Sequence, residues 1–394
     1  MPKWEKMTVG DLCDTISNSY RGDDKEVVLI NTSDVLEGKV LNHQVVENKN
    51  LKGQFKKTFK ENDILYSEIR PANKRYAFVD FSDTDNYIAS TKLMVLRPRM
   101  DVIRPRFLFS FLSSKSVLEE LQQLAETRSG TFPQITFSSE LAPTPINVPD
   151  LETQDRIVGI LGVIERKISM NAEINKNLLQ QSLYIFETLI NSTSKDGCIG
   201  DYCTLKSGFA FKSKWWQDSG IPVIKIGSIN QDYLNLSNCS HVSEDKISLA
   251  KDFIVSGGDL LIAMTGATIG KFTMVPKMHK TILVNQRVGK FFLGENPINK
   301  IPFIYCTLKQ PEIISEIINR GQGSAQPNIS ASDIMSIPCV IPQTEEINNF
   351  NLQTAPMFEL IINNQFENLI LAKTRDLLLP RLMSGEIDIS NISF

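Results

Sequence analysis

Apolar residues recur every three or four positions over two long stretches of the chain, which is the spacing of one face of an α-helix. The first stretch predicts a helix from about residue 152 to about residue 192, which at 1.5 Å per residue would be about 60 Å long. The second predicts a helix that ends near Met383, with Gly385 placed to cap it. The apolar positions are Ile157, Ile160, Leu161, Ile164, Ile168, Ile174, Leu178, Ile185 and Leu189, and then Phe358, Ile361, Ile362, Phe366, Leu369, Ile370, Leu377 and Leu378.

The segments that precede the two long helices mix strand patterns with helical ones. Short apolar runs at residues 27–30 and 222–226 predict buried strands. Apolar residues at helical spacing within residues 117–124 and 313–318 predict one helix in each segment. This mixture predicts an α+β lobe before each long helix.

Short motifs recur in the same order along the chain, at separations of between 190 and 196 residues. Such recurrence indicates a tandem duplication. We therefore expect α+β lobes at residues 1–150 and 196–342, and helical segments at 151–195 and 343–394. The pairs are Gly10-Asp11 with Gly200-Asp201, Asp63-Ile64-Leu65 with Asp259-Leu260-Leu261, Phe132-Pro133-Gln134-Ile135 with Gln326-Pro327-Asn328-Ile329, Pro145-Ile146-Asn147-Val148-Pro149 with Pro338-Cys339-Val340-Ile341-Pro342, and Asn171-Ala172-Glu173-Ile174 with Asn363-Asn364-Gln365-Phe366.

The two long helices are expected to pack against each other as an antiparallel coiled-coil pair. The first leads from one lobe to the next, and the second begins at the second lobe and has to return. Mutual packing also covers apolar stripes that would otherwise be exposed. Asn171, Asn175, Asn363 and Asn364 fall on or near the expected seam, where they would either fix the register or simply lie in solvent.

The chain has 394 residues and a net charge of −3, and the length alone favours two or more domains. The charge is unevenly spread: residues 198–340 carry 14 basic and 11 acidic groups, whereas residues 341–394 carry 3 and 7. A local DNA-binding face is therefore compatible with an acidic total.

Several classes of protein are excluded by what the sequence lacks. It has no apolar run of the roughly 18 residues that span a bilayer and no apolar core of a secretory signal, so we expect a cytoplasmic protein with no membrane partner. Six cysteines without CxxC spacing and three histidines predict no metal site. Residues 266–271 have too few residues between their glycines for a phosphate loop, and Phe272 stands where a hydroxyl side chain is needed. We predict no catalytic residue and no cofactor.

Three motifs resemble the specificity subunits of Type I restriction–modification enzymes. Residues 378–387, Leu-Leu-Pro-Arg-Leu-Met-Ser-Gly-Glu-Ile, resemble the C-terminal signature of that family. Residues 323–329 are similar to the turn that closes its DNA-reading lobes, and residues 257–261 with 265–271 also fit. The first half departs from this pattern, because residues 67–74 replace the glycine-rich turn and residues 128–134 replace the longer Gln-Pro turn.

The resemblance implies a non-catalytic subunit whose two lobes each recognise one half of a split, asymmetric DNA site. It implies that the long helices separate the lobes and bind two methyltransferase subunits, and that two restriction (translocase–nuclease) subunits can join the complex. Candidate partner-binding residues on the helices are Ile164, Ile168, Leu178, Ile361, Phe366 and Ile370.

Candidate DNA contacts are basic and amide side chains in polar, turn-rich segments, because Lys and Arg bind phosphates and Arg, Gln and Asn can bind base edges. The alternative for each is an ordinary surface residue. The candidates are Arg70, Lys74, Arg75 and Arg128 in the first lobe, and Thr265, Lys271, Arg287, Arg320, Gln322 and Gln326 in the second.

Two other functions compete with this interpretation. A stand-alone DNA-binding module, or a decoy of modification enzymes, would bind a specific sequence without a methyltransferase. A scaffold would use its duplicated lobes to bind proteins. Salt-dependent binding to duplex DNA separates the scaffold from the other two.

Overall fold

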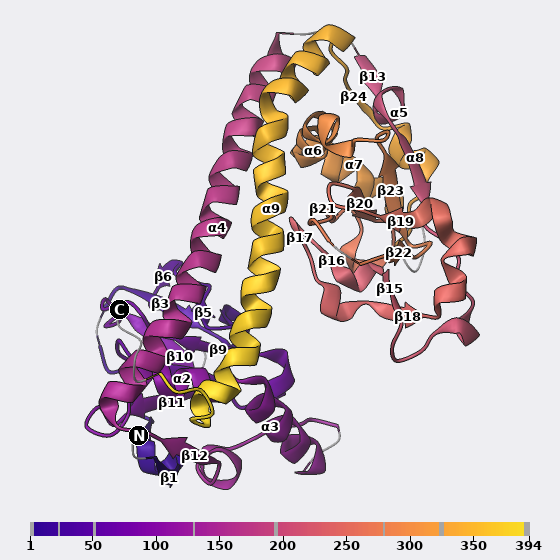
Figure 1. The fold of residues 1–394 in the computed structure, drawn as a ribbon. Coiled ribbons are helices and arrows are strands. Elements are labelled where there is room, and N and C mark those ends of the chain that lie inside the picture. Colours follow the sequence, from indigo (N-terminus) through magenta and orange to yellow (C-terminus); the bar gives the residue numbers. More distant parts are fainter. Residues whose placement is uncertain are drawn as a thin grey trace. The chain divides into compact units, whose positions relative to one another are not determined.

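The computed structural model describes residues 4–22, 24–49, 53–128, 131–192, 196–278, 280–322 and 327–389. The chain forms two compact units (Figure 1). Unit 1 consists of Met1–Arg166 and Ala372–Phe394, and unit 2 consists of Lys167–Leu371. Both long helices therefore contribute residues to each unit.

Unit 1 is built around a four-stranded antiparallel sheet that is buried on both faces. Alternate residues of its strand β8 (Ile64–Ser67) point to opposite sides. Ile64 and Tyr66 pack against helices α2 (Pro105–Leu112) and α3 (Lys115–Arg128), whereas Leu65 packs against a second sheet. In spatial order the first sheet has β2 (Cys13–Ile16), β11 (Leu93–Pro98), β8 (Ile64–Ser67) and β9 (Tyr76–Phe78), and the second has β6 (Val45–Glu47), β3 (Glu26–Ile30), β10 (Tyr87–Ser90) and β7 (Phe55–Lys57).

Unit 2 repeats this arrangement with the same strand order. Leu260 and Ile262 face helices α6 (Ile301–Lys309) and α7 (Pro311–Gly321), and Leu261 faces the second sheet. The second sheet of each unit contains one parallel pair, β3 with β10 in unit 1 and β15 (Ile221–Ile224) with β22 (Ile282–Val284) in unit 2. The strands are β14 (Thr204–Ser207), β23 (Val288–Phe292), β20 (Leu260–Ala263) and β21 (Phe272–Met274), and then β18 (Ser240–Val242), β15 (Ile221–Ile224), β22 (Ile282–Val284) and β19 (Ile254–Val255).

Short elements complete each unit in matching places. They include two-stranded sheets, a one-turn helix directly after the first strand of each unit, and a helical turn before the last strand. In unit 1 they are β1 (Glu5–Thr8) with β12 (Pro145–Val148), β4 (Val35–Leu36) with β5 (Lys39–Val40), α1 (Val9–Leu12) and the π-helical turn Phe137–Leu141; in unit 2 they are β13 (Asp196–Cys198) with β24 (Pro338–Val340), β16 (Ile229–Asn230) with β17 (Tyr233–Leu234), α5 (Ile199–Tyr202) and α8 (Ala331–Met335).

The duplication that the sequence predicts is confirmed, and the repeated aspartates have a structural role. The buried Asp63 carboxylate accepts a hydrogen bond from the Lys60 amide and forms an ion pair with Arg97. The Asp259 carboxylate likewise accepts a hydrogen bond from the Ser256 amide and forms an ion pair with Lys290, and both side chains of this ion pair are largely buried. Each aspartate closes the turn before a central strand, and a buried charge requires such partners.

The two predicted long helices are present as α4 (Leu151–Asn191) and α9 (Thr344–Met383). Within unit 2 they are antiparallel, because Asn171 contacts Glu367 whereas Ser182, further along α4, contacts Met357, an earlier residue of α9 (Figure 1). The α+β class and the antiparallel pair are therefore confirmed.

Three of the four expected seam asparagines join the helices. The Asn171 amide donates to Glu367 at 2.7 Å and to Asn368 at 2.9 Å, and the Asn364 amide donates to Asn175 at 2.8 Å. Asn363 is instead exposed to solvent. Shifting one helix by a turn would leave these buried amides without partners, so they favour one register.

Helix α9 ends in the way that its glycine predicts. Gly385 has a left-handed φ of +72°, and the Glu386 and Gly385 amides donate to the carbonyls of Arg381 and Leu382, at 3.0 and 3.3 Å. These are the two hydrogen bonds of a Schellman motif. A Cβ added at Gly385 would come within 2.9 Å of the Trp4 indole.

We predict that Gly385→Ala lowers the free energy of unfolding by about 1–3 kcal/mol, because it adds both left-handed strain and a clash with Trp4. Gly294→Ala is the matched control, since Gly294 has a φ of +93° but no atom of another described residue lies within 4 Å of where its Cβ would stand. Urea unfolding of both variants should show a smaller loss for Gly294→Ala. Equal losses of unfolding free energy in the two variants would show that the clash with Trp4 contributes nothing.

Candidate nucleic-acid interface

In unit 2, three chain segments are fastened together at the end of strand β20. The Met264 amide donates to the Arg287 carbonyl at 3.0 Å, and the Ile329 amide donates to the Met264 carbonyl at 3.0 Å. The Gly266 amide donates to the Pro327 carbonyl at 2.9 Å. We call this site cradle 2 and define it as residues 264–266, 287 and 328.

Cradle 2 opens into a pocket of about 560 Å³. Arg287 and Asn328 are exposed there, and the Thr265 side chain lines the pocket although only 9% of its residue surface is exposed. Among the described residues, the buried Thr265 hydroxyl has no hydrogen-bond partner. Such a group favours a polar ligand, because an unsatisfied buried hydroxyl is costly. The lining residues are Ser207, Met264, Thr265, Gln286, Arg287, Pro327, Asn328, Ile329 and Ser330.

Unit 1 contains the same three backbone hydrogen bonds. The Glu68 amide donates to the Lys92 carbonyl at 3.0 Å, the Ile135 amide to the Glu68 carbonyl at 2.9 Å, and the Arg70 amide to the Pro133 carbonyl at 3.1 Å. We call this site cradle 1 and define it as residues 68–70, 92 and 134. The strand registers pair the two cradles position by position: Glu68 with Met264, Ile69 with Thr265, Arg70 with Gly266, Lys92 with Arg287, and Gln134 with Asn328.

The paired positions carry different side chains on the same backbone. In cradle 1 the Lys92 ammonium lies 3.5 Å from a Glu68 carboxylate oxygen and 3.3 Å from the Gln134 amide oxygen. In cradle 2, Arg287 is exposed beside an uncharged threonine and asparagine. Both cradles present hydrogen-bonding groups of the kind that bind base edges, but in different combinations.

The structure brings three of the predicted DNA contacts, Arg70, Thr265 and Arg287, into the cradles. Arg75 and Lys271 occupy equivalent positions beside them, and the Arg75 guanidinium donates to the carbonyls of Ser33 and Val35. Gln322 is exposed at the end of α7, and Gln326 lies outside the described residues. Lys74 forms an ion pair with Glu37 at 2.9 Å.

Arg128 and Arg320, two further predicted DNA contacts, make contacts within the fold. Arg128 forms an ion pair with Glu140 at 3.1 Å. Arg320 pairs with Glu316 at 2.8 Å and donates to the Asp333 carbonyl and the Ser336 hydroxyl. Each arginine ties the end of a helix to the helical turn that follows a cradle.

Sequence reasoning missed Glu68, Lys92, Gln134, Gln286 and Asn328 as site residues. The repeat already contained the signal for two of them, since the pairing of residues 132–135 with 326–329 matches Gln134 to Asn328. Lys92 and Arg287 become equivalent only through the strand register.

A patch of lysines and aromatic rings borders cradle 2. The Gln286 amide donates to the Phe209 carbonyl at 3.0 Å, and the Phe209 ring is nearly parallel to that of Trp215. Lys225 lies 3.7 Å from the centre of the Trp216 ring, and burial lowers the pKa of its ammonium. Lysines held in this way provide positive charge at fixed points, as phosphate contacts require.

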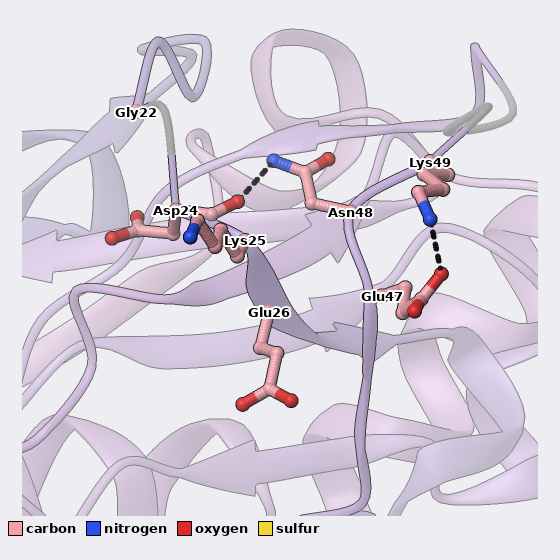
Figure 2. Close-up of a pocket in the computed structure, with 7 residues that line it drawn as sticks. All are labelled: Gly22, Asp24, Lys25, Glu26, Glu47, Asn48 and Lys49. Carbon is pink, nitrogen blue, oxygen red and sulfur yellow. Dashed lines mark hydrogen bonds and ion pairs between the residues drawn. The ribbon is translucent and has the colours of Figure 1, made fainter.

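Unit 1 also contains an open pocket of about 740 Å³ that does not suit DNA (Figure 2). Its lysines are offset by carboxylates: Lys49 pairs with Glu47 at 2.9 Å, and Asp24 and Glu26 stand nearby. The Asn48 amide donates to the Asp24 carbonyl at 2.8 Å. Three carboxylates would repel a phosphate backbone.

The predicted partner-binding residues of the helices differ in exposure. Ile361 is buried in the core of unit 2, so its side chain is not available to a partner, and Leu178 packs against the same core. Ile370 is 49% exposed, whereas Ile164, Ile168 and Phe366 are partly buried. The amphipathic stripe from which they were chosen mainly faces the chain's own core.

A second apolar stripe on α4 is open to solvent. Met170, Ile174 and Tyr184 are 58%, 39% and 73% exposed. At about 100° per residue, the three side chains fall within about 80° of each other around the helix axis. Sequence periodicity did not separate this outer stripe from the inner one.

No helix among the described residues is long and apolar enough to cross a membrane, and no group of three or more histidine, cysteine or acidic residues among them could hold a metal ion. Burial raises the pKa of the Cys13 and Cys203 thiols to about 12. Such thiols are protonated and unreactive at neutral pH.

The chain consists of two units of one fold in tandem, each with a cradle at the end of a central strand. The Type I restriction modification DNA specificity domain matches the chain twice, over residues 1–180 and 191–368. A Type I restriction enzyme specificity subunit of Haemophilus influenzae is 31% identical over 98% of this chain and 100% of its own length. A Type I specificity subunit of Methanocaldococcus jannaschii is 24% identical over 74% of this chain and 71% of its own length.

The chain belongs to the Type I restriction–modification DNA specificity family. The solved S subunit of a Type I system from M. genitalium has the same fold, with a TM-score of 0.53 at 17% identity over 99% of this chain and 97% of that one. The predicted identity as a non-catalytic specificity subunit is confirmed by the family match and the relative from Haemophilus influenzae.

The different roles of two arginines generate a prediction. Arg320→Ala should lower the free energy of unfolding by about 1–3 kcal/mol, because it removes hydrogen bonds between α7 and α8, and should leave the recognised sequence unchanged. Arg287→Ala should leave stability within about 0.5 kcal/mol and weaken binding to cognate duplex about 10- to 100-fold. Thermal unfolding and fluorescence anisotropy measure the two effects. The reverse pattern would mean that the roles are misassigned.

Proposed function

We propose that this chain recognises a bipartite, asymmetric DNA site, with one half contacted by each unit, and directs methyltransferase subunits to it. The observation that carries the proposal is the pair of cradles, which share a backbone and differ in side chains. Two cradles with the same backbone geometry and different hydrogen-bonding groups are suited to recognise two different half-sites.

Affinity in this proposal comes from basic groups around each cradle, and discrimination comes from the cradle side chains. Lys212 and Lys225, which lie over the Trp215 and Trp216 rings in the patch that borders cradle 2, supply positive charge. Phosphate contacts fix the position of the duplex but carry no sequence information. Binding should therefore weaken steeply with salt at cognate and random duplexes alike.

The partners in this proposal are two methyltransferase subunits, and two restriction subunits where the cell supplies them, all acting in the cytoplasm. The relatives are named as subunits of Type I restriction enzymes, which supports an assembly of this kind. The exposed stripe of Met170, Ile174 and Tyr184 on α4 offers the chemistry of a subunit interface, where Met and Tyr are enriched.

The function is tested by co-expressing the chain with an adenine methyltransferase encoded beside it and mapping methylated adenines across the host genome. We expect methylation at one split motif with two different halves. Methylation that is unchanged when this chain is deleted would contradict the proposal. Sequence-specific binding without any methyltransferase association would favour a stand-alone module.

The interface on α4 can be tested by placing an acid on its exposed stripe. Ile174→Asp should reduce co-purification of the methyltransferase at least about tenfold, because burying an unpaired carboxylate opposes association. Lys176→Asp introduces the same residue at another exposed position of the same helix and should leave co-purification intact. Equal behaviour of the two variants would exclude this stripe from the interface.

A further inference from the structure

The turn of cradle 1 holds two charged residues in a backbone conformation that glycine normally supplies. In unit 2 the turn after β20 uses Gly266 and Gly270, with φ of +72° and +81°. The strand register pairs these glycines with Arg70 and Lys74 of unit 1, whose φ values are +45° and +53°. A side chain in this region strains the backbone, so unit 1 retains strain that unit 2 avoids.

The fold makes no use of the Arg70 side chain. The Arg70 amide donates to the Pro133 carbonyl, but the Gly266 amide makes the same bond to Pro327 without a side chain. Arg70 is exposed, and no ion pair or hydrogen bond of its guanidinium with another described residue is found. Lys74 differs, because its ammonium pairs with Glu37.

Among the described residues of cradle 1, Arg70 is the one cation whose side chain has no hydrogen-bond or ion-pair partner. The other cation, Lys92, has Glu68 and Gln134 as neighbours at 3.5 and 3.3 Å. A guanidinium with free donors can form the two parallel hydrogen bonds that guanine accepts at O6 and N7 in the major groove. Strained residues that the fold does not need are found mainly at functional sites.

We propose that Arg70 is the specificity-determining residue of unit 1 and contacts a guanine in the half-site of that unit. The proposal rests on the proposed DNA-recognition function. Unit 2 has glycine at this position, so its recognition falls to the Thr265 hydroxyl, Arg287 and Asn328. A different residue at one position of a shared backbone thus makes the two halves of the site differ.

The experiment maps the methylated motif in cells that co-express the methyltransferase with wild-type chain, Arg70→Gly, Arg287→Ala or Asn62→Gly. Arg70→Gly copies unit 2 and should leave the melting temperature unchanged or higher, because it removes strain. It should reduce discrimination at one G·C pair of one half-site, on the order of 10- to 100-fold. Arg287→Ala should relax a position in the other half.

Asn62→Gly is the matched control, because Asn62 also has a left-handed φ, of +70°, in unit 1 but lies outside cradle 1. Its motif should equal that of the wild type. Arg70→Asn provides a second variant, since Asn tolerates left-handed φ and lacks the guanidinium fork. It should relax the same G·C pair as Arg70→Gly.

Three results would overturn the proposal for Arg70. An unchanged motif in both Arg70 variants would show that Arg70 does not set specificity. A uniform loss of methylation at every sequence, with a shallower salt dependence, would assign Arg70 to a phosphate. A markedly lower melting temperature of Arg70→Gly would give Arg70 a structural role. If the wild type itself yields no split motif, the proposed function fails instead.

Discussion

Each unit depends on a four-stranded antiparallel sheet that is buried on both faces. Alternation along β8 and β20 sends one set of residues to the helices and the other set to a second sheet. With both faces covered, the sheet offers a ligand only its ends and the turns that leave them. The cradles lie there, at the ends of β8 and β20, where the following turn meets two other segments.

Backbone hydrogen bonds fix the conformation of each cradle, so its side chains are not needed for the fold and remain available for DNA recognition. The three bonds at Glu68, Arg70 and Ile135 recur at Met264, Gly266 and Ile329, with lengths that agree to within about 0.2 Å. Because no side chain takes part in these bonds, the residues at these positions can change without loss of the frame. Duplication of one recognition unit, followed by substitutions at these positions, can in this way give a protein that recognises two different half-sites.

The sequence predicted those parts of the fold that follow from periodicity and glycine placement. The helices α4 and α9, the Schellman end at Gly385, the duplication and the antiparallel seam are all visible as patterns in one chain. The contacts of individual arginines could not be predicted in this way. In the sequence Arg128 and Arg320 have the features of solvated cations, and only the fold places them beside Glu140 and Asp333. The burial of Ile361 has a related cause: helical spacing shows an apolar face but not whether the chain itself covers it.

The strained turn of unit 1 shows a further limit of sequence patterns. Residues 67–74 lack the glycines of residues 263–270 and would be taken for a different turn, yet the structure gives both the same left-handed positions. Tertiary hydrogen bonds to Pro133 and Lys92 impose a conformation that the local residues disfavour. The absence of glycine from residues 67–74 therefore changes the side chains of the turn but not the path of its backbone.

We infer that the two cradles are interchangeable backbone frames and that their side chains alone choose the half-site. The most direct measurement transfers the cradle 2 residues to unit 1, as Glu68→Met, Ile69→Thr, Arg70→Gly, Lys92→Arg and Gln134→Asn together, and maps the methylated motif in the presence of the methyltransferase. We expect the half-site of unit 1 to take on the specificity of unit 2. A folded variant that still methylates the original asymmetric motif would contradict it.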